Sequence, residues 1–174
     1  PPVLPEYDPD MPRGSVSYDV ELARQLLVSN GWSADNLPEL IYGTTPGPTS
    51  RLFFEQFRAW MMRIGYPAEK IVLQTYATFG DIAKAWSNSE LPLVSKGWGL
   101  DFPDAENTLQ LFYGPNASPG SNDANYQNGE YDELFTQAAV MQPSAERTSI
   151  YRRMNQMVVN DCVAFSGLSR AQIV

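Results

Sequence analysis

The sequence contains no histidine, and its only cysteine is Cys162. Without histidine, the chain lacks the commonest general base of enzymes, the usual orienting residue of a catalytic triad and the commonest metal ligand. A lone cysteine can form neither an internal disulfide nor a cysteine-based zinc cluster. We therefore predict no catalytic residue, no metal site and no cofactor, and these absences favour a binding function.

Basic residues are also scarce, because 12 lysines and arginines stand against 20 aspartates and glutamates, a formal net charge of −8. So acidic a surface repels nucleic acid and anionic membranes, and we expect no nucleic-acid partner. No stretch approaches the roughly 20 consecutive apolar residues of a transmembrane helix. The 174 residues, 43% of them hydrophobic, suffice for one globular domain with a core. Because the chain begins with Pro1-Pro2 and not with methionine, we expect a fragment or a processed form.

Helix and strand patterns alternate after a proline-rich start, residues 1–16, which predicts an extended entry linker. A loop at 114–128, rich in Gly, Asn, Pro and Ser, has a length typical of functional or mobile loops. Short apolar runs predict strands at 40–42, 71–73, 91–94 and 163–165, and periodic apolar residues predict helices at 19–30, 50–64, 79–86, from 105, from 131 and at 144–158. The order of the first strands and helices favours a parallel sheet with crossover helices, an α/β fold.

The second predicted helix carries a stripe of aromatic residues. Phe53, Phe57 and Trp60 recur at spacings of three and four, and this stripe predicts the face that packs on the core. We expect Thr49 or Ser50 to cap the helix at its amino end.

The segment from Gly97 to Asp101 brings together the end of a predicted strand, a large aromatic and an acid. Ligands of α/β folds bind beyond the carboxyl ends of strands, so Trp98, between Gly97 and Gly99, is a candidate pocket wall. The segment is no dinucleotide fingerprint, because Phe102 stands where the third glycine belongs. For Asp101, the two interpretations of a solvated turn acid and a ligand-binding group stay equally open.

Two further residues lie at predicted helix starts. Asp104 precedes the helix that begins at 105, and an N-cap is the favoured interpretation over a ligand contact. Phe79 follows a predicted strand, and we expect it either to line the same crevice as Trp98 or to pack beneath it.

Several blocks of the sequence agree in their order with one known family. They are Tyr18-Asp19 with Ala23, Leu26-Leu27 and Gly31; Gly97-Trp98 with Asp101, Asp104 and Asn107; Asn125-Tyr126 with Asn128; and Glu130-Tyr131-Asp132-Glu133-Leu134 with Glu146-Arg147 and Tyr151. Over residues 18–162 the chain resembles the substrate-binding proteins of ABC importers in the oligopeptide, dipeptide and nickel class, solute-binding family 5. The resemblance implies that residues 17–174 belong to the second lobe of a two-lobed clamp. Such a periplasmic-binding-protein-like lobe is α/β, with a small, mainly parallel β-sheet flanked by helices.

The resemblance also implies a ligand-binding site. In peptide-binding relatives, the acid that matches Asp101 pairs with the α-ammonium of the peptide. The aromatics that match Trp98 and Phe79 line side-chain pockets, and Gly97 and Gly99 complete the set of expected ligand-binding residues.

Ligand and partners follow from the same resemblance. It implies a peptide, or another cationic or amphipathic solute such as an opine, haem or oligosaccharide, held between this lobe and the first lobe of the same protein. It also implies delivery to the membrane permease of an ABC importer, in the periplasm or another extracytoplasmic space. Some relatives meet the peptide carboxylate with arginines, but Trp86 and Ser95 stand at those places here, so we do not expect that clamp.

Two alternatives from other classes stay open. One is a secreted carbohydrate-active enzyme with Asp101 and Glu106 as its acid pair and with Trp98 and Trp86 stacked on sugar, which requires the two carboxyls to face each other at about 5–10 Å. The other is an interaction module whose acidic surface binds a basic partner, which an exposed apolar patch elsewhere on the molecule would support.

Overall fold

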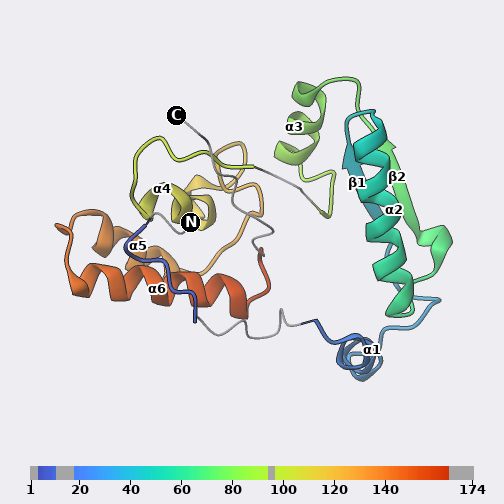
Figure 1. The fold of residues 1–174 in the computed structure, drawn as a ribbon, viewed down its shortest axis with the longest axis horizontal. Helices are drawn as coiled ribbons and strands as arrows, with labels where there is room; N and C mark the ends of the chain where they lie inside the picture. The colour runs from blue at the N-terminus through green and yellow to red at the C-terminus, as the bar shows by residue number, and fades with distance from the viewer. Residues whose placement is uncertain (1–3, 11–17, 94–96, 165–174) are drawn as a thin grey trace. The chain divides into compact units, whose positions relative to one another are not determined.

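The computed structural model describes residues 4–10, 18–93 and 97–164 (Figure 1). The chain divides into two compact units. Unit 1 comprises the described residues of 1–17 and 97–174, and unit 2 comprises those of 18–96. Each unit has its own hydrophobic core, so the two are described separately.

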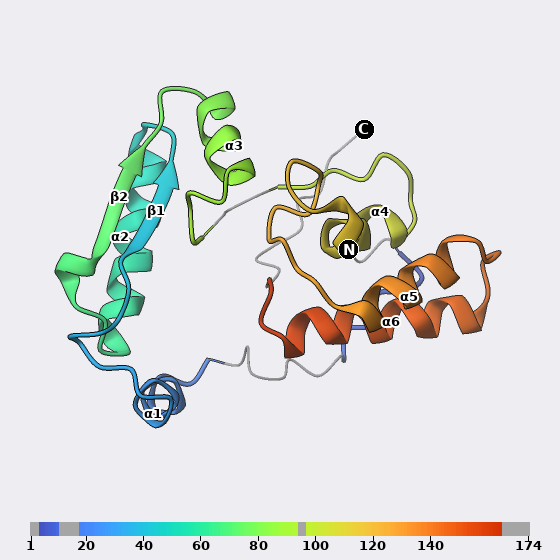
Figure 2. The same ribbon diagram turned by 180° about the vertical axis from the view of Figure 1, so that it is seen from behind.

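Unit 2 is built on two parallel strands, β1 (Leu40–Thr44) and β2 (Ile71–Thr75), in which Leu40 lies opposite Ile71 (Figure 2). The helices of the unit are α1 (Val20–Ser29), α2 (Pro48–Arg63) and α3 (Phe79–Ser87). The α/β class with a small parallel sheet flanked by helices is therefore confirmed. The strand expected at 91–94 is reduced, within the described residues, to one isolated parallel bridge between Leu93 and Tyr42.

Helix α2 packs along the two strands with a different face from the one that we predicted (Figure 1). Phe54 is buried, and Phe57 and Met61 pack with it against residues of β1 and β2. Phe53 and Trp60 are 63% and 49% exposed, so the predicted stripe is wrong for these two residues. Both rows keep helical spacing, and only the position of the sheet decides which row is buried.

The helix starts follow capping chemistry. Asp19 accepts the Leu22 N–H at 2.8 Å and caps α1, and Ser144 accepts the Arg147 N–H at 3.1 Å, as predicted. The predicted cap of α2, Thr49 or Ser50, is wrong. The helix begins before these residues, at Pro48, and Gly47 is its N-cap. Proline is favoured at the first helical position, where its missing N–H has no partner to lose.

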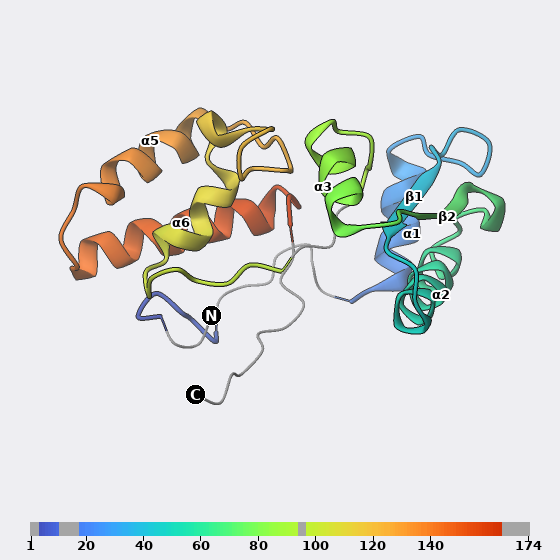
Figure 3. The same ribbon diagram turned by 90° about the horizontal axis from the view of Figure 1, so that it is seen from above.

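Unit 1 is helical and is built mainly from two long helices, α5 (Gly129–Ala139) and α6 (Ala145–Asn160), which lie side by side (Figure 3). The short helix α4 (Glu106–Leu109) packs on both. The core between them includes Leu4, from the proline-rich start of the chain. A last strand was expected at 163–165; Val163 and Ala164 are not in a strand, and residue 165 lies outside the described residues.

A buried amide side chain, that of Asn122, links both ends of the long loop 114–128. Asn122 is fully buried, and its Nδ2 donates to the carbonyls of Tyr113 and Tyr126 at 3.1 and 3.0 Å. Its Oδ1 accepts the Tyr126 N–H at 3.2 Å. These three bonds add to the backbone hydrogen bonds within the loop, and they make the loop a structural part of unit 1.

The structure predicts a measurable cost for removing this side chain. We expect Asn122→Ala to lower the free energy of unfolding by about 2 kcal/mol, because three partly buried backbone groups lose their partner. Asn160→Ala is the control, since the exposed Asn160 side chain makes a single bond, to Gln156 at 2.8 Å, and we expect less than about 0.5 kcal/mol there. Urea unfolding of both variants measures the difference; equal midpoints would contradict the role of Asn122.

Candidate functional site

The segment from Gly97 to Asp101 lies in unit 1, immediately before α4, and it is largely exposed. Trp98 is 39% exposed, and its indole Nε1 donates to Asn107 Oδ1 at 2.9 Å. The Asp101 N–H donates to the same oxygen at 3.4 Å. A buried residue of α4 thus holds both the aromatic and the acid of the segment in place.

The carboxylate of Asp101 points to no partner in the described part of the chain. It takes part in no hydrogen bond or ion pair there, and the residue is exposed. A carboxylate in this state keeps its full capacity to accept hydrogen bonds from a cation, and an ammonium is the simplest group that would use it.

The two glycines of the segment are not required by the fold. Neither Gly97 nor Gly99 has a positive φ, and a Cβ built on either would meet no described atom within 4 Å. Glycine in an ordinary backbone conformation with open space beside it weakens the folded state through its entropy. The space on this side of the backbone instead suits the close approach of another molecule.

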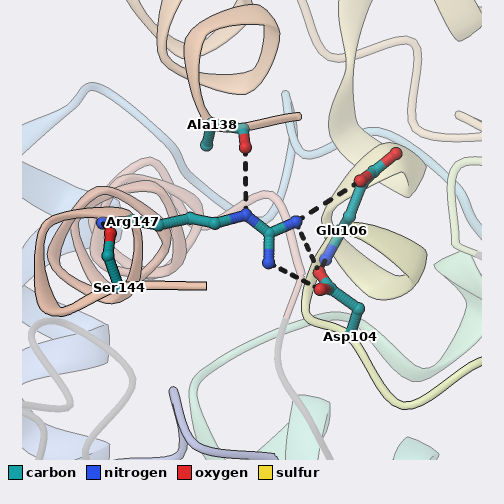
Figure 4. Close-up of polar contacts among 5 residues, drawn as sticks. All are labelled: Asp104, Glu106, Ala138, Ser144 and Arg147. Atoms are coloured by element: carbon teal, nitrogen blue, oxygen red, sulfur yellow. Dashed lines mark hydrogen bonds and ion pairs between the residues drawn. The ribbon is translucent and has the colours of Figure 1, made fainter. Parts of the chain in front are cut away.

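Asp104, three residues further on, has a structural role in unit 1 (Figure 4). Its Oδ1 accepts the Glu106 N–H at 2.9 Å, but the predicted N-cap position is wrong, because α4 begins at Glu106 with Ala105 as its N-cap. Its two oxygens also accept from Arg147 Nη1 and Nη2 at 2.6 and 3.2 Å. No local sequence pattern predicts this pairing, because the two residues are 43 positions apart.

Arg147 is nearly buried, with 6% of its surface exposed, and its guanidinium is almost fully used. Its Nε donates to the Ala138 carbonyl at 3.0 Å, and Nη2 lies 3.6 Å from the Glu106 carboxylate (Figure 4). Its guanidinium also lies over the ring of Tyr151, 4.7 Å from the centroid. A single cation therefore ties α4, α5 and α6 together.

The ionisation of these groups agrees with their geometry. Burial by itself would raise the pKa of Asp104, but the hydrogen bonds from Arg147 and the Glu106 N–H, with the charge of Arg147, leave the pKa below its ordinary value. The hydrogen bond to Asp104 raises the pKa of Arg147 against the opposing effect of burial. Both shifts favour the charged pair.

Phe79 lies in unit 2, at the start of α3 after the capping residue Thr78. Its ring is 68% exposed and contacts the buried ring of Trp86 edge-on, with 5.7 Å between centroids. It borders a cavity of about 180 Å³ at the carboxyl end of β1, lined by Tyr42, Gly43, Thr44, Thr45, Ser50, Phe53, Phe79, Ile82 and Trp86. None of these lining residues is charged, so the cavity suits an uncharged group.

The structure does not favour the arrangement that a sugar-cleaving site requires. Glu106 faces the Arg147 guanidinium, and Trp86, packed in the core of unit 2, is only 6% exposed. Within the described residues there is no group of three or more side chains placed to hold a metal ion. None of the helices described is both long and apolar enough to cross a membrane.

Comparisons with known proteins give a consistent result. Residues 1–120 match the family model of bacterial extracellular solute-binding proteins, family 5 Middle. Heme-binding protein A of Haemophilus influenzae is 27% identical over 165 residues, 92% of this chain and 29% of that protein. A probable di/tripeptide-binding protein 5 of Pseudomonas aeruginosa is 26% identical over 164 residues, 91% of this chain and 29% of that protein. The chain therefore spans less than a third of the length of these relatives.

Solved structures share the fold. HbpA2 from Haemophilus parasuis superposes with a TM-score of 0.80 at 23% identity, over 94% of this chain and 32% of that one. The periplasmic binding protein DppA from Helicobacter pylori, in complex with the peptide STSA, superposes with a TM-score of 0.78 at 22% identity, over 94% of this chain and 31% of that one.

Proposed function

The chain belongs to the bacterial extracellular solute-binding proteins of family 5, and from this premise we propose that it is part of the second lobe of a peptide-binding protein. The whole protein would bind a peptide between two lobes outside the cytoplasm and deliver it to the permease of an ABC importer, without catalysis. The observation that carries the proposal is the exposed segment 97–101, where a carboxylate without a partner among the described residues follows a tryptophan between two unconstrained glycines.

Asp101 is the proposed anchor for the α-ammonium of the peptide. An exposed carboxylate gains little from a cation in water, but closure of the first lobe over this one would exclude water and strengthen the pair. A charge-assisted hydrogen bond in such a setting contributes about 1.5–3 kcal/mol. Closure also gives selectivity, because a ligand without a cation would leave the carboxylate buried and unpaired.

The proposed role of Gly97 and Gly99 is to let the main chain of the peptide approach the main chain of the segment. Peptides are widely bound by backbone hydrogen bonds to an extended segment, with pockets for alternate side chains. Such a mode tolerates many side chains, and the exposed ring of Trp98 offers an apolar surface beside it.

Phe79 is proposed to contact the ligand through the cavity of unit 2. At about 180 Å³ the cavity is comparable to engineered cavities of about 150 Å³ that bind benzene. An uncharged side chain of that size fits its walls, and a carboxylate would find no cation among the lining residues.

The function is tested by calorimetric titration of a full-length protein that contains this chain with tripeptides and with their N-acetylated counterparts. We expect the free peptides to bind and acetylation to weaken binding by about tenfold or more, because it removes the ammonium. The 174-residue chain alone should bind poorly, since it offers only part of the contacts. Failure of all peptides to bind, or indifference to acetylation, would refute the proposal.

The proposed role of Gly99 in ligand binding can be tested separately. We expect Gly99→Ala to lower peptide affinity roughly tenfold, because a methyl group would enter the space for the ligand backbone. The free energy of unfolding should stay the same or rise by about 0.4–1 kcal/mol, since the new Cβ meets no described atom.

Gly129→Ala is the matched control for this prediction. Gly129 opens α5, has no positive φ and likewise leaves open space beside its backbone. The same substitution there should change neither affinity nor ligand preference. Equal peptide affinities of both variants and the parent protein, measured by titration, would show that the glycines of the segment do not take part in ligand binding.

A further inference from the structure

Asn107 is a buried residue whose side chain bonds to a side chain and to a backbone N–H of the exposed segment. It lies in α4 and is 1% exposed. Its Oδ1 accepts the indole N–H of Trp98 at 2.9 Å and the backbone N–H of Asp101 at 3.4 Å. The two donors identify this atom as the amide oxygen, because the amide nitrogen would present hydrogens to them.

The stability of the fold does not explain an asparagine here. Its Nδ2 is buried and has no hydrogen-bond partner within the described residues. A buried donor without a partner costs free energy, and an apolar side chain of similar volume would avoid that cost. Local costs of this kind are expected at functional sites, and among the described residues the gain that offsets this cost is the pair of hydrogen bonds accepted by the Asn107 oxygen.

We propose that Asn107 is a positioning residue that sets the ligand affinity of the segment 97–101 through Trp98 and the Asp101 backbone. The inference rests on the proposed function and deepens it. Gly97 and Gly99 give this segment high backbone freedom. The two bonds to the Asn107 oxygen restrain the tryptophan and the acid before ligand arrives, and preorganisation reduces the ordering cost of binding.

The mechanism predicts how Trp98 behaves in the free protein. Its indole N–H should be hydrogen-bonded without ligand, and therefore protected from hydrogen exchange although the residue is 39% exposed. The resonance is assigned by its loss in Trp98→Phe, and this measurement needs no Asn107 variant. Exchange at the rate of a free indole in the unliganded protein would overturn the proposal.

The binding test is a double-mutant cycle in a full-length protein that contains this chain. Asn107→Leu should reduce peptide affinity about tenfold and release the Trp98 indole N–H to exchange. In the Trp98→Phe background, the same change should cost clearly less, because one of its two bonds is already absent. Asn160→Leu, at an exposed site in α6, controls for the substitution itself.

The outcomes separate this inference from the function on which it rests. If Asp101→Asn weakens binding while Asn107→Leu does not, the peptide site stands and the positioning role is refuted. If the effects of Asn107→Leu and Trp98→Phe are fully additive, Asn107 does not act through Trp98, and the inference is likewise refuted. If no peptide binds to the parent protein, the proposed function itself fails.

Discussion

Arg147→Met is expected to lower the free energy of unfolding of unit 1 by about 3 kcal/mol. The substitution keeps much of the length of the side chain but leaves Asp104, 24% exposed, with an uncompensated negative charge. Loss of one partner of a buried ion pair costs about 3–5 kcal/mol, and the lower end applies because Asp104 reaches solvent. The Ala138 carbonyl also loses the Nε donor. Urea unfolding, with hydrogen exchange of α6 amides as the probe of unit 1, measures the effect.

The control lies on the same helix. Arg153 pairs with Glu130, but their side chains are 61% and 55% exposed, so Arg153→Met removes an equal charge from a solvated pair. Surface ion pairs contribute about 0–1 kcal/mol, and we expect a change in that range. Similar losses in the free energy of unfolding for the two variants would show that Arg147 stabilises the fold no more than a surface arginine does.

The pH dependence provides a second check on the same pair. The pKa of Asp104 is lowered in the folded state, so its contribution is fully present above the ordinary value of about 3.9 and is lost as pH falls through the lower, folded value. In Arg147→Met the main cause of the lowered Asp104 pKa is absent. The stability gap between the parent protein and the variant should therefore narrow below about pH 4, and a constant gap down to acid unfolding would contradict the ion pair.

The helix starts and the two main strands were predictable from local chemistry. Asp19 and Ser144 each precede a periodic apolar run, and a cap followed by such a run is a signal contained within a few residues. The buried face of α2 was not predictable in the same way. Phe53 and Phe54 are neighbours, each begins a row with helical spacing, and only the sheet against which α2 packs selects the row of Phe54.

The residues of the candidate site also differ in whether local sequence or tertiary structure reveals their role. Trp98 and Asp101 were singled out because the resemblance and the strand-end position point to them, and both remain ligand-binding proposals. Arg147 and Asn107 act through pairs that depend on tertiary structure, and no local pattern reveals which acid an arginine will meet. The sequence favoured a structural role for Asp104 and left Asp101 open, but only the tertiary structure shows that Arg147 pairs with Asp104.

Asp101→Asn is expected to lower peptide affinity about 10- to 100-fold in a full-length protein that contains this chain. The variant keeps the shape of the side chain but removes the charge, and a charge-assisted bond of about 1.5–3 kcal/mol becomes a neutral one. Stability should change by less than about 0.5 kcal/mol, because the Asp101 carboxylate is exposed and bonds to nothing in the described part of the chain. Titration calorimetry and urea unfolding on the same preparation separate the two effects.

Two acids of unit 1 serve as controls for this experiment. Glu133→Gln changes the net charge equally at an exposed position of α5, and it tests whether general acidity alone attracts cationic peptides. Asp104→Asn should give the opposite pattern, a loss of stability through Arg147. If Asp101→Asn destabilises the protein while peptide affinity is unchanged, the acid is structural. The selectivity of the site for a free α-ammonium depends on this contrast, since an N-acetylated peptide should lose no further affinity when Asp101 becomes asparagine.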